Sequence, residues 1–306
     1  MFWHATREVA RKEFLQHIRS TRLIIVGLLF AASLIVTTIV FPVSLGFDEA
    51  FSEGDGANRA DGPYVPGGEN VAMAFFLTIP ILGGVFFMQV LAIIMTSDAV
   101  CSEWNNRSIF LLLSKPVPRG AFLLGKFLGS VVPLVVMVSL LMIIDYLVLQ
   151  AIFPGDTIAR DWGRFFGGLG MIVLGLTVFS TMGLFFSTLT RSTLASLFMT
   201  FGVAFLALPL VGLIGEINLW TDQENAAFGE LDPDAAEYDW SRYFNPGSIF
   251  TKANEVIAGE DFAFGFSFLV PTQAPAHTWL SVVAGLGFAV LFYAGAWVMV
   301  QTRNFE

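Results

Sequence analysis

Six long, mostly apolar stretches, each able to cross a bilayer as a helix, constrain this chain more than any other feature. They cover residues 23–43, 71–96, 127–149, 165–189, 193–214 and 279–300. A helix needs about 20 mostly apolar residues to cross a membrane, and only helices or closed barrels satisfy their backbone in lipid. Barrel strands alternate in pieces of about ten residues, whereas these stretches are continuously apolar. The sequence therefore predicts an all-α integral membrane protein with six transmembrane helices.

Lys and Arg are distributed unevenly between the segments that join these helices. With six spans the two termini share one side, and the segments on that side carry eleven of the 16 Lys and Arg residues. The opposite side carries nineteen of the 25 acidic residues. Because short cytoplasmic segments are enriched in Lys and Arg, we expect a multi-pass protein of the cytoplasmic (cell) membrane with both termini cytoplasmic. The acidic outer face is typical of a surface that stays hydrated in a salty exterior, or of a vestibule that collects cations.

The composition argues against several other classes of protein. Only 13% of the residues are charged and 55% are hydrophobic, whereas soluble domains are about a quarter charged. The single Cys cannot form a disulfide framework, and with three His it leaves too few ligands for a structural zinc site. We therefore expect one membrane domain over residues 1–306, with no metal, no cofactor and no nucleic-acid partner.

Two polar regions are expected to fold outside the six spans. Residues 1–22 predict a basic interfacial helix on anionic lipid headgroups, with an apolar face formed by Trp3, Ala10, Phe14 and Ile18; a merely solvated leader is the alternative. Residues 215–276 form the largest extracytoplasmic region. In it Asn245-Pro246 predicts a helix start and Gly259 a stop, and the apolar face of this helix is formed by Ile249, Phe250, Ala253 and Ile257.

The segment after that helix alternates Phe with small residues over 262–268. Alternation with a period of two predicts an extended segment with one aromatic side. It suits packing against the ends of the spans, or a lid over the exit of an amphiphilic substrate.

Few residues suggest chemistry within the membrane. The spacing Gly120-x4-Gly125-Lys126 is similar to a phosphate-binding loop, but Phe127 stands where Ser or Thr must reach the magnesium ion. No His lies inside a predicted span, so intramembrane hydrolysis lacks a base. We therefore expect a non-catalytic protein.

Asp145 is the clear ionisable residue within a predicted span, and such residues are functional candidates by default. It lies about 27 Å along its helix, near the outer interface. There it can meet water or Arg164, or it can handle a substrate or a proton. On the same stretch, Gly125-x3-Gly129 permits close approach of another helix, and Pro133 predicts a kink.

The connection between the second and third spans, residues 97–122, is the most informative segment. It is polar at its start and apolar over Ile109–Leu113, a pattern typical of a short helix that docks into a groove on a partner. Two prolines, Pro116 and Pro118, then redirect the chain into the third span.

This connection resembles the coupling segment of the membrane subunits of type-two ATP-binding-cassette (ABC) exporters. The family pattern places Asp, Glu, a small hydroxyl residue, two Leu, Pro and a base at the positions of Asp98, Glu103, Ser108, Leu112, Leu113, Pro116 and Arg119. Arg107 replaces the usual Gly and Trp104 the usual base, so the turn and the ion pairing differ here. The basic leader and Asn245-Pro246 also resemble the interfacial helix and the outer re-entrant region of that family.

The resemblance implies a permease subunit that exports a substrate by using ATP hydrolysed in a separate cytoplasmic ATPase. Two permease copies, identical or different, would pair, and the segment around Glu103–Arg119 would pass the movement of the ATPase to the membrane helices. ATP would be bound by the partner. The alternatives are an ATP-independent channel or secondary carrier, and an assembly factor without transport. The substrate class is open among copper-enzyme maturation, drugs, peptides and lipids.

Overall fold

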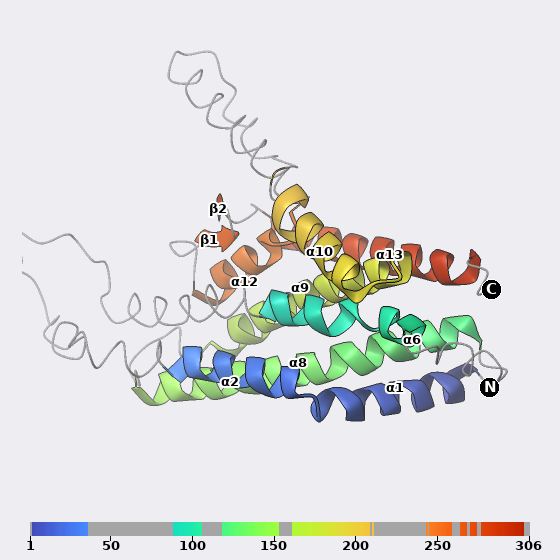
Figure 1. Cartoon of the computed structure of the whole chain (residues 1–306). Helices are drawn as coiled ribbons and strands as arrows, with labels where there is room; N and C mark the ends of the chain where they lie inside the picture. The colour runs from blue at the N-terminus through green and yellow to red at the C-terminus, as the bar shows by residue number, and fades with distance from the viewer. Residues whose placement is uncertain are drawn as a thin grey trace, which may run out of the picture.

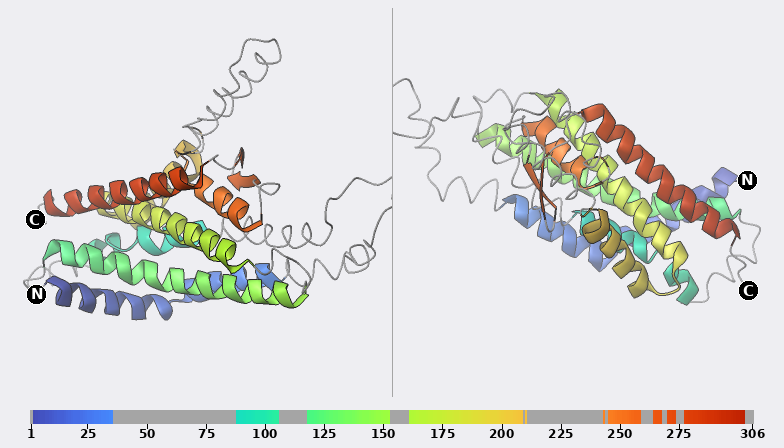
Figure 2. Two further views of the ribbon diagram at one scale, coloured as in Figure 1. Left: turned by 180° about the vertical axis from the view of Figure 1, so that it is seen from behind. Right: turned by 90° about the horizontal axis from the view of Figure 1, so that it is seen from above.

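The computed structural model describes residues 2–35, 88–105, 118–152, 161–208, 210, 243, 245–258, 264–267, 270–273 and 277–302. These residues form an elongated bundle of helices with a short hairpin on one side (Figure 1). Both chain termini lie at the same end of the bundle in two opposite views (Figures 1 and 2). We call this the termini end, marked by Phe2 and Thr302, and we call the other the hairpin end.

The long helices lie side by side along the length of the bundle (Figure 1). The helices are α1 (Phe2–Ile18), α2 (Thr21–Ile35), α6 (Cys101–Asn105), α8 (Arg119–Ile152), α9 (Trp162–Leu189), α10 (Thr193–Gly202), the π-helix η3 (Val203–Ala207), α12 (Ser248–Ala258) and α13 (Thr278–Thr302). Residues 88–97 are also helical. Two strands, β1 (Phe264–Ser267) and β2 (Val270–Gln273), pair antiparallel.

Three helices in the described residues are long and apolar enough to cross a membrane: α8, α9 and α13. They correspond to the predicted spans at 127–149, 165–189 and 279–300. A fourth is present if α1 and α2, bent by 57°, are counted as one broken span. The described parts of the other predicted spans, in α2, residues 88–96 and α10–η3, are helical, but 36–87, 209 and 211–242 lie outside the described residues. The all-α membrane class is thus supported, and the number six stays a prediction.

The longest helix, α8, explains how the bundle extends beyond a bilayer. Its 34 residues correspond to about 51 Å, and the hydrocarbon core is only about 30 Å thick. The helix continues through Pro133 as a single element. Its first turns, at the termini end, therefore have room to lie outside the lipid and to meet polar segments.

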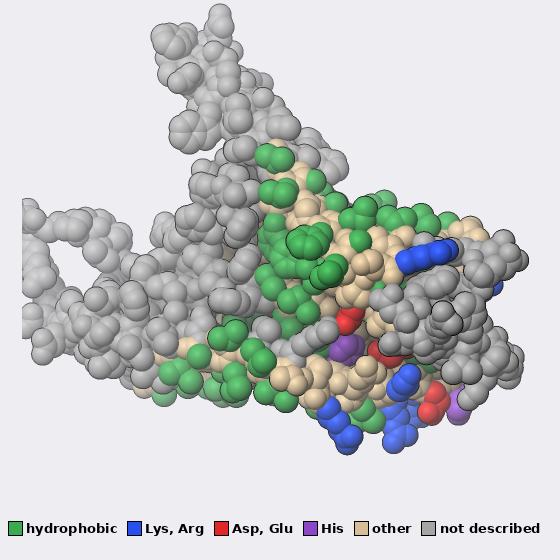
Figure 3. All heavy atoms as spheres, in the orientation of Figure 1, with side chains coloured by type: hydrophobic (Ala, Val, Ile, Leu, Met, Phe, Trp, Pro, Cys, Tyr) green, Lys and Arg blue, Asp and Glu red, His purple; other side chains and the backbone are tan. Residues whose placement is uncertain are grey.

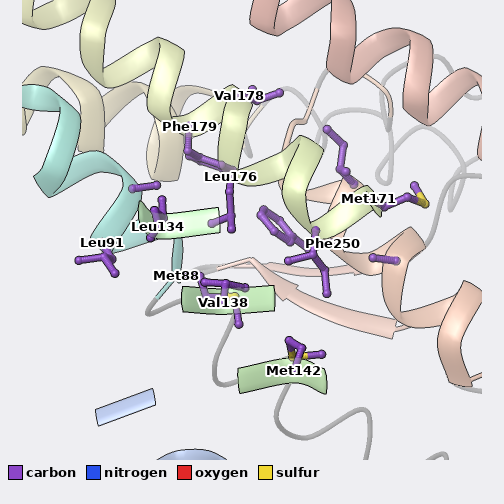
Figure 4. Packing of buried hydrophobic residues seen from close by; sticks show 14 of the residues in the cluster. Met88, Leu91, Leu134, Val138, Met142, Met171, Leu176, Val178, Phe179 and Phe250 are labelled. Atoms are coloured by element: carbon purple, nitrogen blue, oxygen red, sulfur yellow. The ribbon is translucent and has the colours of Figure 1, made fainter. Parts of the chain in front are cut away.

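The core is formed where α8, α9, α12 and residues 88–97 meet. Figure 4 shows Met88, Val138, Leu176 and Phe250, one from each of these elements, converging on the same space. All are at most 3% exposed. Burial of such side chains contributes roughly 1.5–3 kcal/mol each, so this contact holds the inner segments together across long distances in sequence.

The helix predicted from Asn245-Pro246 is present as α12. The amide N–H of Gly247 donates to Asn245 Oδ1 at 3.0 Å, and the predicted apolar face is at most 3% exposed at Ile249, Phe250, Ala253 and Ile257. This face packs on α9: a Cβ added to Gly168 would lie 2.2 Å from Ile257 Cγ1. The extended segment predicted over 262–268 is confirmed for β1.

Two residues of the predicted apolar face of α1, Trp3 and Ile18, lie on its exposed side, and the predicted contact of this face with lipid headgroups stays a prediction. Trp3 is 74% exposed and Ile18 44%, whereas Thr6 and Glu13 are buried at 3% and 4%. The helix lies alongside the start of α8 (Figure 1), and its buried residues are Thr6 and Glu13. The predicted region 1–22 is also divided, because α1 ends at Ile18 and α2 begins at Thr21.

Candidate functional site: a buried ion cluster beside the coupling segment

A buried ammonium group joins three elements at the termini end of the bundle. Lys126 Nζ of α8 lies 2.8 Å from Glu103 Oε1 of α6 and 2.8 Å from Glu13 Oε1 of α1. The three residues are 3%, 8% and 4% exposed. We call these residues, together with His17 and Ser130, the Lys126 cluster.

His17 and Ser130 complete the cluster through Glu13. His17 Nε2 lies 3.8 Å from Glu13 Oε2, one helical turn earlier on α1, and 3.1 Å from Ser130 Oγ on α8. Lys126 Nζ also lies 5.7 Å from the centre of the Phe122 ring. Since a buried charge is stable only when paired and hydrogen-bonded, Lys126 fixes α6 and α1 to α8.

The close approach of α1 to α8 depends on two glycines. A Cβ at Gly125 would lie 2.7 Å from Val9 Cβ, and one at Gly129 would lie 2.4 Å from Glu13 Cβ and 3.0 Å from the Ala10 carbonyl oxygen. These are the two positions of the predicted Gly125-x3-Gly129 contact, which the structure confirms. The missing side chains let the Glu13 carboxylate reach Lys126.

The short helix α6 is held from the other side by α9. The backbone N–H groups of Val100 and Cys101 donate to Ser187 Oγ at 3.0 and 3.1 Å. The Cys101 thiol lies 3.1 Å from the Ser187 carbonyl oxygen, and all of these atoms are buried. The start of the predicted coupling segment is therefore seated between α8 and α9.

The two hydrogen bonds to Ser187 Oγ predict that Ser187→Ala lowers the stability of the protein. The change leaves two buried N–H groups without their acceptor, and each such loss costs about 1–3 kcal/mol. We expect the free energy of unfolding in detergent to fall by about 2 kcal/mol. Thr177→Val is the matched control, because Thr177 donates only within α9, to the Val173 carbonyl oxygen. Equal stability of the two variants would contradict the seat.

Arg119 connects the end of the predicted coupling segment to the last helix. Its Nη1 atom donates to the carbonyl oxygen of Gln301 at 3.0 Å and to that of Val300 at 3.4 Å. Both carbonyls belong to the last turn of α13, where the helix dipole favours a positive charge. Basic side chains also gather along α1 at this end of the molecule, drawn in blue in Figure 3.

Some of the predicted coupling residues lie within the described part of the chain and others lie outside it. Glu103 lies in the Lys126 cluster, Arg119 binds α13, and the Asp98 carbonyl oxygen accepts from the Ser102 N–H at 2.9 Å, at the start of α6. The remaining predicted residues, Arg107, Ser108, Leu112, Leu113 and Pro116, and the predicted docking patch Ile109–Leu113 lie outside the described residues.

Asp145 differs from its expected surroundings. The residue is only 4% exposed. It is therefore buried in the protein, away from the water expected there. Arg164, the expected partner, is paired with Asp161 at 3.1 Å. The neighbouring Tyr146 stacks on Phe165 of α9 with ring centres 4.2 Å apart, which fixes this turn of α8 against α9.

Sequence reasoning missed Glu13, His17 and Lys126 as members of a site. In the sequence Lys126 belongs to a pattern similar to a phosphate-binding loop; the structure instead places Gly120 to Lys126 in the helix α8. The available signal was the isolated Lys at the start of an apolar stretch, together with Glu13 and His17 one helical turn apart. The two carboxylates that pair with Lys126, those of Glu13 and Glu103, lie 90 residues apart in the sequence. No local pattern could therefore link them.

Comparison with known proteins identifies the family of the chain. A search of curated proteins finds none that matches the chain. The profile of the family described as "ABC-2 family transporter protein" matches residues 7–304, which is nearly the whole chain and includes every residue of the Lys126 cluster. The chain therefore belongs to the ABC-2 family of transporter proteins.

Proposed function

We propose that this protein is the permease subunit of an ABC exporter in the cytoplasmic membrane, driven by ATP hydrolysis in a separate ATPase. Family membership supports a membrane component of ABC transport. Three parts of this proposal go beyond family membership: the pairing with an ATPase, the presence of a second permease copy and the cytoplasmic position of the termini end. The transported substrate is not assigned.

The observation that carries this proposal is the double ion pair of Lys126. It joins the predicted coupling segment, through Glu103, to a long membrane-spanning helix and to α1. A partner that moves α6 also moves the Glu103 carboxylate, and separating this buried charge from Lys126 is energetically costly. The three elements therefore move together, as a rigid-body switch requires.

The test is ATP turnover by the chain co-purified with the ATPase encoded beside it and reconstituted in liposomes. We expect Glu103→Gln to assemble normally and to change ATP turnover by about two- to thirtyfold, since substitutions along a coupled path alter coupling by roughly 0.5–2 kcal/mol. Glu8→Gln is the matched control, because Glu8 is an exposed acid on α1.

Two outcomes would contradict the proposal. Equal turnover by the Glu103→Gln and Glu8→Gln complexes would remove the Lys126 cluster from the coupling path. Substrate flux through liposomes that hold this chain alone, without the ATPase, would instead support an ATP-independent channel or secondary carrier.

A further inference from the structure

An apolar groove runs along the first half of α13. Its volume is about 390 Å³, and it is lined by Leu280, Val283, Ala284, Gly287, Phe288 and Leu291, with Tyr243 beside them. Most of its lining residues belong to the first half of α13, which lies nearer the hairpin end, whereas the start of α8, which carries Lys126, lies at the termini end (Figure 1). It is independent of the coupling path described above.

Two glycines on opposite faces of α13 show which side of this helix is open. A Cβ at Gly285 would lie 2.8 Å from Ile249 Cδ1 and 2.9 Å from Leu174 Cδ2, so this face is filled by protein. A Cβ at Gly287 would meet nothing within 4 Å. An unfilled apolar surface loses the dispersion contacts that its atoms would otherwise make, so another apolar molecule gains by entering it.

The surroundings indicate the chemistry of that molecule. In the most apolar window of α13 only 17% of the residues are buried inside the protein, and both Val283 and Leu291 are more than half exposed. A membrane-spanning helix with such a surface faces lipid. The groove runs from Leu280 to Leu291, about 16 Å along a helix, which matches half of a hydrocarbon core about 30 Å thick.

The end of the groove nearest the start of α13 has polar and aromatic groups. The His277 N–H donates to the Tyr243 hydroxyl at 3.1 Å, and the His277 and Trp279 rings stack with centres 6.4 Å apart. Trp279 is 63% exposed. Trp and Tyr gather at the boundary between hydrocarbon and headgroups, so this end lies at headgroup level.

We propose that the groove binds one acyl chain of a membrane phospholipid, in the leaflet at the hairpin end. The headgroup lies by Tyr243 and Trp279, and the chain extends along α13 over Gly287 towards Leu291. The length of one leaflet, the wholly apolar lining and the polar end all fit a phospholipid.

The test compares two exposed glycines that have open space around them. Gly287→Leu fills the groove, whereas Gly170→Leu adds the same side chain to α9, where a Cβ also meets nothing within 4 Å. Each protein is reconstituted in vesicles of palmitoyl-oleoyl phosphatidylcholine, extracted again in detergent, and examined by native mass spectrometry for bound phospholipid.

We expect the wild type and Gly170→Leu to retain one phospholipid, and Gly287→Leu to retain about tenfold less, because several buried methylene groups lose their site. Ala284→Leu, which also narrows the groove, is expected to act in the same way if Gly287→Leu folds poorly. The proposal is overturned if the folded wild type retains no phospholipid, or if the groove variants retain as much as Gly170→Leu.

Discussion

Lys126→Met is expected to lower the free energy of unfolding by about 3–5 kcal/mol, the largest effect of any substitution considered. The change removes the shared cation from two buried carboxylates, Glu13 and Glu103, each 2.8 Å from its ammonium nitrogen. Breaking a buried pair by removing one partner typically costs this much, because the remaining charge is left uncompensated. The measurement is unfolding in detergent, monitored by circular dichroism against denaturant.

Two further variants separate the role of the charge from that of the side chain's bulk. Lys12→Met removes an exposed cation from α1 and is expected to change stability by less than about 0.5 kcal/mol. The triple variant Lys126→Met, Glu13→Gln, Glu103→Gln removes every charge of the double pair, and we expect it to recover much of the loss. A triple variant no more stable than Lys126→Met would mean that packing, rather than charge, holds the three elements together.

Gly129→Leu has the second largest expected effect, a loss of roughly 3 kcal/mol. Its Cβ would lie 2.4 Å from Glu13 Cβ and within 3.0–3.3 Å of the backbone of Ala10 and Phe14. Backbone atoms cannot rotate away, so α1 must move off α8 and withdraw Glu13 from Lys126. We expect lower thermal stability in detergent and, in the complex with an ATPase, altered turnover.

The control for Gly129→Leu is the same substitution at a helical glycine that no neighbouring atom obstructs, where the gain in helix propensity should stabilise the protein. Gly is about 0.8–1 kcal/mol less favourable than Ala in a helix, so replacing an unobstructed glycine should stabilise the protein slightly. Gly170→Leu on α9 meets nothing within 4 Å and is expected to raise the unfolding temperature or leave it unchanged. If Gly129→Leu behaved in the same way, the contact between α1 and α8 would not be as close as described.

Local patterns in the sequence predicted the helix α12 and the strand β1 well. The helix α12 was predicted from a cap, a proline and four apolar residues at helical spacing, and β1 from alternation of Phe with small residues. Each signal lies within about a dozen residues and reports directly on which face is buried. The same holds for Gly125 and Gly129, whose spacing predicted the helix contact that the structure confirms.

The burial of Glu13 on α1 could not be predicted in this way, because its partners are distant in sequence. Charged residues on a helix are usually solvated, and no local pattern indicates that Glu13 is buried. In the structure the carboxylate is buried, since Lys126 and Glu103 neutralise it, while Trp3 is exposed. The π-helix η3 likewise gave no sequence signal, because it adds only one residue per turn to an apolar stretch.

The two contacts at the start of α8 have a consequence for how force would spread through the chain. Arg119 holds the final turn of α13, and Lys126, two turns later, holds α1. The helices α1 and α13 are thus both bound to one short stretch of α8, Arg119 to Lys126, which follows residues 106–117 in the sequence. A displacement of this stretch of α8 would therefore be transmitted to both α1 and α13, the helices at the two ends of the described chain.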